Sequence, residues 1–301
     1  MRKFCLLAFI IAVIMASCGQ TYEEKQQLSR EERAELRKKD SLALKVAVMP
    51  TFDCLPLYLA KDERLFDTLG VDVHLKCFTA QMDCDTAIMG HTAEGIVSEL
   101  VSTGRMIRRG TPLKYLTSTD AYWQLITNRT ARISQVNQLG DKMVAMSRYS
   151  ATDFFTDKVL RGVKTKAKVF RIQINDVNVR LDMMLNNMMD AAWMTEPQAT
   201  CARRRSNNVI ADTKNMKYKF GVIAFRSDCY RDNRRTKQIK AFSEAYNRAC
   251  DSINKNGIRY YASLLLKYYK LDATMVKALP KMEFRHIEKP NSLDIENANK
   301  W

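Results

Sequence analysis

The chain has 301 residues, with 49 lysines and arginines against 33 aspartates and glutamates, and its formal net charge is +16 at pH 7. This length suits one two-lobed protein or two small domains. The positive charge is scattered over ordinary solvent-facing positions and accompanies no RNA- or DNA-binding motif, so it does not predict nucleic-acid binding.

The N-terminus has the pattern of an export signal. A basic pair, Arg2-Lys3, precedes an apolar run over residues 4–16 that is too short to span a bilayer. Small residues then stand directly before Cys18 and resemble a bacterial lipobox, which implies cleavage before Cys18 and a lipid on its thiol. We therefore expect residues 1–17 to be a lipoprotein signal peptide. A transmembrane anchor is the weaker alternative, because the sequence becomes charged from Thr21 onward.

Residues 18–41 contain few large apolar side chains and alternate glutamate with lysine and arginine. Such a segment cannot bury enough surface to join a core. We predict a solvated, partly helical tether that holds the folded part away from a membrane.

The folded part begins near residue 42 and alternates strand and helix patterns. Period-two alternation predicts strands, and apolar residues three or four apart predict amphipathic helices. In the first half we predict strands over residues 44–49, 71–78 and 113–117 and helices over 55–65 and 96–109. Within residues 83–95, Gly90 is expected to end a helix, and the polar side chains are expected to lie on loops.

The second half has the same organisation. Strands are predicted over residues 122–127, 138–146, 169–174, 190–194, 208–212 and 221–225, and helices over 177–189, 237–251 and 258–269. Glu196-Pro197 ends the strand over residues 190–194, because proline has no amide hydrogen to donate. The hydroxyl-rich loop over residues 147–153 is typical of a helix N-cap. Residues 203–205 are predicted to be a solvated helix end.

Two separated segments carry a resemblance to a known family. Asp190-Ala-Ala-Trp193, with Glu196-Pro197 after it, and the segment over residues 56–73 are similar to motifs of the type II periplasmic binding proteins. The similar branch binds nitrate, sulfonates, taurine or thiamine-pyrimidine precursors. The resemblance implies an α/β fold of two lobes with a ligand cleft between them. Lobe 1 would comprise residues 42–125 and 224–301, and lobe 2 residues 126–223.

In such a fold the ligand contacts loops at the carboxyl ends of strands and the N-termini of helices. We therefore expect the ligand to be bound by Phe52, Asp53, Gln81, Asp83, Thr119, Ser147, Tyr149, Thr152, Trp193 and Glu196.

Aromatic side chains and carboxylates are frequent at these positions, and Arg148 is the one full positive charge among the predicted loop residues. An anion would be repelled by unneutralised carboxylates. The composition thus favours a neutral or weakly cationic heteroaromatic ligand, stacked on a partly buried Trp193, over a small oxyanion. The alternative is that most of these rings pack in the core.

No metal site or cofactor is expected. Asp83, Cys84, Asp85, His91 and Glu94 lie close together in the sequence, but their spacing fits no zinc pattern. Six cysteines follow Cys18, and their spacing fixes no disulfide pairing. We expect Cys201 to be a free thiol.

The resemblance implies a monomeric, lipid-anchored substrate-binding protein of the cell envelope. It would capture a small molecule and deliver it to an ABC-type permease in the inner membrane. Two alternatives remain open: an enzyme of the same fold that acts on a thiamine or menaquinone precursor, and a ligand-sensing lipoprotein without a transporter. Only three histidines are present and no nucleophile–base pair is visible, which disfavours the enzyme.

Overall fold

The computed structural model describes residues 22–301, so the predicted signal peptide and Cys18 lie outside the described residues. The chain divides into two units, Met1–Ala43 and Leu44–Trp301. The first unit contains one described helix, α2 (Tyr22–Leu42), in the region predicted to be a partly helical tether. Within the described part of the chain, no helix combines the length and the apolarity that crossing a bilayer requires.

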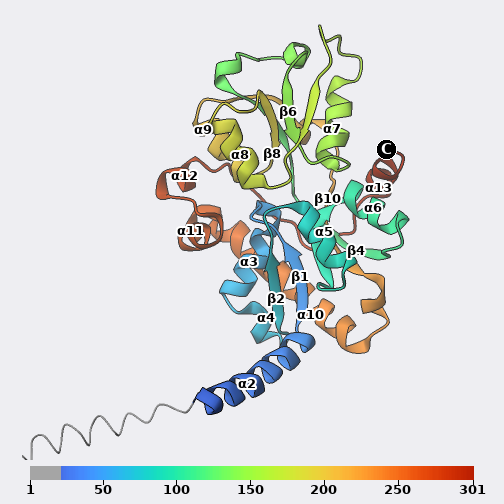
Figure 1. Cartoon of the computed structure of the whole chain (residues 1–301), viewed down its shortest axis with the longest axis vertical. Helices are drawn as coiled ribbons and strands as arrows, with labels where there is room; N and C mark the ends of the chain where they lie inside the picture. The colour runs from blue at the N-terminus through green and yellow to red at the C-terminus, as the bar shows by residue number, and fades with distance from the viewer. Residues whose placement is uncertain (1–21) are drawn as a thin grey trace, which may run out of the picture. The chain divides into compact units, whose positions relative to one another are not determined.

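The second unit contains two five-stranded mixed sheets (Figure 1). The first sheet has the strand order β2-β1-β3-β10-β4, in which β10 is antiparallel to both of its neighbours. Its strands are β1 (Leu44–Val48), β2 (Val73–Cys77), β3 (Gly95–Glu99), β4 (Leu113–Ser118) and β10 (Gly221–Arg226).

The second sheet has the order β7-β6-β8-β5-β9, in which β5 is antiparallel to β8 and β9. Its strands are β5 (Gln124–Thr127), β6 (Met143–Met146), β7 (Phe170–Gln173), β8 (Ala191–Met194) and β9 (Asn208–Asp212). Each sheet with its helices forms one lobe, as expected for the predicted two-lobed α/β fold.

Helices cover both faces of each sheet. The α-helices are α3 (Leu55–Asp62), α4 (Leu65–Thr68), α5 (Gln81–Met89), α6 (Leu100–Arg108), α7 (Ala151–Leu160), α8 (Val177–Leu185), α9 (Gln198–Arg204), α10 (Asn233–Asn256), α11 (Ala262–Tyr269), α12 (Ala273–Ala278) and α13 (Ser292–Asn299). Short 3-10 helices are η1 (Phe52–Cys54), η2 (Arg129–Ala131), η3 (Val136–Leu139), η4 (Thr213–Met216), η5 (Ser227–Tyr230) and η6 (Ile258–Tyr261).

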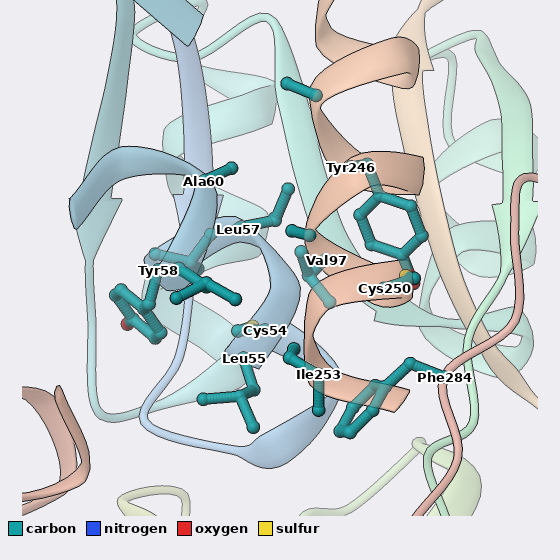
Figure 2. Packing of buried hydrophobic residues seen from close by; sticks show 14 of the residues in the cluster. Cys54, Leu55, Leu57, Tyr58, Ala60, Val97, Tyr246, Cys250, Ile253 and Phe284 are labelled. Carbon is teal, nitrogen blue, oxygen red and sulfur yellow. The ribbon is translucent and has the colours of Figure 1, made fainter. Parts of the chain in front are cut away.

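The core of lobe 1 lies mainly between the sheet, α3 and α10. Leu57 and Ala60 from α3 and Tyr246, Cys250 and Ile253 from α10 are all buried in one cluster (Figure 2). A separate cluster packs α5 and α6 against the opposite face of the sheet. Since both faces are covered, the central strands β3 and β10 are buried at nearly every position.

In lobe 2, successive residues of a strand enter different clusters. Leu125 and Val144 pack with α7, whereas Ile126 and Ala145 pack with α8 and α9. This alternation follows from the period of two along a β-strand. It places α7 on one face of the second sheet and α8 with α9 on the other.

Two segments connect the lobes, residues 119–123 and residues 213–220. They lie against each other where the Thr119 amide donates to the Gly221 carbonyl at 2.8 Å. A Cβ atom at Gly221 would meet Thr119 Oγ1 at 2.1 Å. The close approach of the two crossings therefore requires glycine at this position.

Several sequence-based boundaries need correction. The predicted lobe boundaries at 125/126 and 223/224 fall inside β5 and β10, so the crossings lie a few residues earlier in the chain. The C-terminal segment does not belong to lobe 1 alone, because the indole of Trp301 donates to Asp157 of α7 at 2.6 Å.

The predicted elements differ most from the observed ones in the first half of the chain. Residues 96–99 belong to the buried strand β3 and not to the start of a helix. Gly90 does end a helix, α5, as predicted, although Asp83 and Asp85 lie on that helix and not on a loop. Ile96, Val97, Leu100 and Val101 have the spacing of one helical face, and periodicity cannot separate a buried strand followed by a helix from one longer helix in such a run.

Candidate functional site

The candidate site is a cavity between the two lobes. Its walls come from residues that follow the carboxyl ends of parallel strands: Met49 and Thr51 after β1, Ser98 and Glu99 at the end of β3, Ser147 after β6, and Thr195 after β8. Parallel sheets place ligands at this edge. Gln81 of α5, Ala151 and Thr152 of α7, Arg180 of α8 and Gln198 of α9 complete the cavity.

Hydrogen bonds close the two lobes over this cavity. The Phe52 amide donates to the Glu196 carbonyl at 2.9 Å, and the Val177 amide donates to the Thr79 carbonyl at 3.0 Å. The hydroxyl of Thr79 also donates to the Asp176 carboxylate. The structure thus describes a closed arrangement of the lobes.

A buried cation, Arg180, lines the cavity from the lobe 2 side, and its side chain is 4% exposed. Its guanidinium donates to the carbonyls of Ile174 and Trp193 and to the hydroxyl of Ser147, each at 2.9 Å. Within residues 22–301, no carboxylate lies within 4.0 Å of it. Burial lowers the pKa of Arg180 to about 10, and Asp176 acts in the opposite direction from farther away.

A charge in this setting is costly unless a counter-charge is present. Arg180 nevertheless stays protonated at neutral pH, because a pKa of about 10 is well above 7. The arrangement therefore favours an anionic group in the cavity.

The N-terminus of α7 adds to the positive potential. The Ser150 side chain caps this helix by accepting from the Thr152 amide at 3.2 Å, and the Thr152 hydroxyl accepts from the Ser147 amide at 3.1 Å. The amide of Ala151, the first residue of the helix, has no acceptor inside the helix. Helix N-termini carry partial positive charge and favour anions.

Gln198 supplies the complementary group, a buried acceptor. Its Nε2 donates to the Pro50 carbonyl at 3.0 Å, which fixes the orientation of the amide because a carbonyl can only accept. Its Oε1 is left without a donor among the described residues. An unsatisfied buried acceptor costs about 1–3 kcal/mol, which a ligand N–H or O–H group would recover.

Two carboxyl groups face the cavity from lobe 1. Burial raises the pKa of Glu99 to about 7, although the amides of Val101 and Ser102 donate to its carboxylate and partly oppose the shift. Burial also raises the pKa of Asp53. Both groups are therefore easier to neutralise than ordinary carboxylates, and this reduces their repulsion of an anion.

The cavity is small, with a volume of about 70 Å³. One water molecule needs roughly 10–15 Å³ by such a measure, and benzene occupies a cavity of about 150 Å³. The closed lobes therefore leave room for a group of a few heavy atoms and not for a pyrimidine ring.

Five of the ten predicted site residues line this cavity: Asp53, Gln81, Ser147, Thr152 and Trp193. Three of the other five lie apart from it on exposed or hinge positions. Asp83 is exposed on α5, Tyr149 is 59% exposed, and Thr119 lines a different cavity beside the lobe crossings.

Phe52 and Glu196 are buried for structural reasons. Phe52 packs edge-on against Tyr269 in the lobe 1 core. Glu196 accepts from Tyr122 at 2.8 Å and from the Thr200 hydroxyl and Arg203 at 2.6 Å each. Its carboxylate is thus fully used by protein groups, and Arg203 is not the solvated residue that the sequence suggested.

The predicted stacking platform also needs correction. Trp193 is 0% exposed, packs in the lobe 2 core, and donates its indole N–H to Thr156 Oγ1 at 2.8 Å. It borders the cavity without offering a free ring face. Of the aromatic residues considered from the sequence, half-buried Trp123 is the one that lines the cavity and retains exposed surface.

Arg180 and Gln198 were missed, although the sequence contained a clue to the first. Arg180 precedes Met184 by four residues, which places both on the buried side of α8. A charged residue on a buried stripe is rarely accommodated without a partner. Arg148, the cation that the sequence suggested, instead pairs with Asp153 at 3.0 Å.

The described residues contain no cluster of three or more side chains suited to a metal ion. The six cysteines from Cys54 to Cys250 are free thiols, and burial raises the pKa of Cys201 to about 11. Neither observation adds a reactive group to the cavity.

Two mixed α/β lobes, joined by two crossings and closed over a cavity, define the fold of the periplasmic binding proteins, as the sequence motifs predicted. Solved structures with this fold include the aliphatic sulphonate binding protein SsuA from Escherichia coli, at 16% identity and a TM-score of 0.69 over 86% of each chain. The alkanesulfonate-binding protein SsuA from Xanthomonas axonopodis pv. citri, bound to MOPS, gives 14% identity and a TM-score of 0.70 over 86% of this chain and 90% of that one.

The nitrate-binding protein NrtA from Synechocystis PCC 6803 has 15% identity and a TM-score of 0.67, over 79% of this chain and 68% of that chain. No protein-family model matches the sequence, and no curated protein matches it. At these identities the similarity establishes the shared fold.

Proposed function

We propose that the chain is the ligand-binding protein of an ABC-type importer and captures a small polar molecule between its two lobes. The observation that carries this proposal is Arg180, a buried cation on the cavity wall with no carboxylate within 4.0 Å in residues 22–301. A protein that used the cleft only to join two lobes would gain nothing from a charge that lacks a counter-charge.

The ligand that fits this wall has an anionic group and, at a short distance from it, a hydrogen-bond donor. The anionic group would accept from Arg180, Ser147 and the first turn of α7, and the donor would face Gln198 Oε1. This combination replaces the heteroaromatic ligand expected from the sequence, since Trp193, the predicted stacking platform, is buried and the cavity is smaller than a ring requires.

Closure of the two lobes would be the signal that a permease recognises. A ligand that contacts both lobes binds the closed form better than the open form and so increases its population. The bonds from Phe52 to Glu196 and from Val177 to Thr79 form only when the lobes meet, and they would favour the same state. We propose that a monomer in this closed state is what the permease recognises, and that a lipid on Cys18 holds the chain at the envelope.

Native mass spectrometry of the chain purified from its own host tests the capture and the anchor together. We expect a chain that begins at Cys18 and carries acyl mass, together with a small molecule that dissociates on denaturation. A Cys18→Ser chain should lose the acyl mass and keep the small molecule. A full-length, unacylated chain would contradict the anchor alone, and a chain that never carries a small molecule would contradict the capture.

A further inference from the structure

A second cavity, of about 410 Å³, lies beside the lobe crossings and is separate from the cleft cavity. Its walls are residues 119–122 from the first crossing, residues 213–219 from the second, and residues 281–285 from the segment before α13. A volume of this size is in the range of small-molecule sites.

The cavity is strongly basic. Its lining contains five cations, Lys214, Lys217, Lys219, Lys281 and Arg285, against Asp120 and Glu283. Both oxygens of Asp120 are already bound by Arg285, from its backbone amide at 2.9 Å and its side-chain Nε at 2.7 Å. Lys281 lies 3.9 Å from Glu283.

The other three lysines have no such partner. Within residues 22–301, no carboxylate lies within 4.0 Å of the amino groups of Lys214, Lys217 or Lys219. Lys214 lies over the Tyr122 ring, 3.7 Å from its centroid. This contact holds one ammonium at the cavity wall through a cation–π interaction.

A second, independent observation indicates a ligand. Thr119 is one of the residues that line this cavity, it is 1% exposed, and its Oγ1 has no hydrogen-bond partner among the described residues. Gly221 provides the space that this hydroxyl occupies, since a Cβ there would meet it at 2.1 Å. A buried hydroxyl without a partner is destabilising unless something binds to it.

We infer that this hinge cavity binds a small phosphorylated polyanion. Three ammonium groups favour a ligand with several negative charges over a ligand with a single carboxylate. A phosphoryl oxygen can in addition accept a hydrogen bond from the Thr119 hydroxyl. A flat anionic lipid surface also attracts lysines, but it would not fill a concave site of this volume. The inference does not depend on the proposed transport function.

Binding of a polyanion in the hinge cavity would be coupled to binding of the ligand in the cleft. The cavity includes both crossings, whose backbone conformation must change when the lobes open. A polyanion that binds one lobe arrangement better than the other therefore changes the affinity for the cleft ligand, and the coupling is reciprocal.

Isothermal titration of the full chain with pyrophosphate tests the site. We expect one saturable site in the wild type and affinity at least roughly tenfold weaker in the Lys214→Gln/Lys217→Gln double variant. The matched control is Lys237→Gln/Lys240→Gln on α10, which removes the same charge at the same spacing from exposed positions and should change affinity less than about twofold.

Thr119→Val gives the sharpest signature. It should weaken pyrophosphate binding while leaving the midpoint of urea unfolding unchanged or higher, because it removes an unsatisfied polar group without changing the shape of the side chain. Arg180→Gln should leave pyrophosphate binding intact. Loss of binding in Arg180→Gln, equal losses in the two lysine double variants, or no saturable binding in the wild type would each overturn the inference.

Discussion

Replacing Trp193 by alanine lowers the free energy of unfolding by about 3–5 kcal/mol, the cost usual for removing a fully buried large aromatic side chain. Trp193 is 0% exposed and stands 5.9 Å, centroid to centroid, from Phe155. Its indole N–H donates to Thr156, so alanine leaves both a cavity and a hydroxyl that has lost a donor. Urea unfolding followed by circular dichroism measures the change.

Two further variants serve as controls for the loss of stability in Trp193→Ala. Trp193→Phe fills most of the space and loses only the N–H donor and part of the ring, so its cost should be about 1–2 kcal/mol. Trp123→Ala removes a half-buried ring that packs 5.5 Å from Phe155, and it should cost less than Trp193→Ala. If Trp193→Ala unfolds like the wild type but fails to bind the ligand, Trp193 is a binding platform after all.

Replacing Arg180 by glutamine weakens binding of the cleft ligand by roughly 10- to 150-fold, since hydrogen bonds to charged groups contribute about 1.5–3 kcal/mol. Glutamine still offers one donor to the Ile174 or Trp193 carbonyl but removes the positive charge. Calorimetry with the small molecule that co-purifies with the wild-type chain measures the affinity.

The outcomes of related variants separate charge from geometry. Arg180→Lys keeps the charge and loses the planar fork that reaches three acceptors, so its affinity should fall between those of the wild type and Arg180→Gln. Arg204→Gln, at an exposed position at the end of α9, is the control for net charge and should bind as the wild type does. Wild-type affinity in a folded Arg180→Gln chain would show that the ligand does not contact this cation.

Much of the fold could be predicted because apolar residues in each strand and helix follow the period of that element. The strand at residues 44–48, the helix around Tyr246 and the strand before Glu196-Pro197 were all expected close to where they lie. The strand at residues 95–99 was not, because it is buried on both faces and the spacing of Ile96, Val97, Leu100 and Val101 also fits a helix that runs through the boundary at Glu99.

The site could be predicted only in part, because sequence places a residue on a loop without giving the direction of its side chain. The loops after β1, β6 and β8 do border the cavity, yet Phe52 and Trp193 point into the cores beside it. From the sequence, Glu196 was expected to bind a ligand. Its partner Tyr122 is distant in the sequence, and its partner Arg203 was predicted to be solvated. Tertiary contacts of this kind decide which polar groups remain for a ligand.

Small-angle X-ray scattering of the chain, stripped of its co-purified molecule and then reloaded with it, tests the central proposal most directly. The account predicts a larger radius of gyration in the stripped chain and, after reloading, a curve that matches the closed lobes of residues 44–301. The same ligand should fail to compact the Arg180→Gln chain at equal concentration. Identical curves for stripped and saturated wild-type chain would contradict capture by two closing lobes.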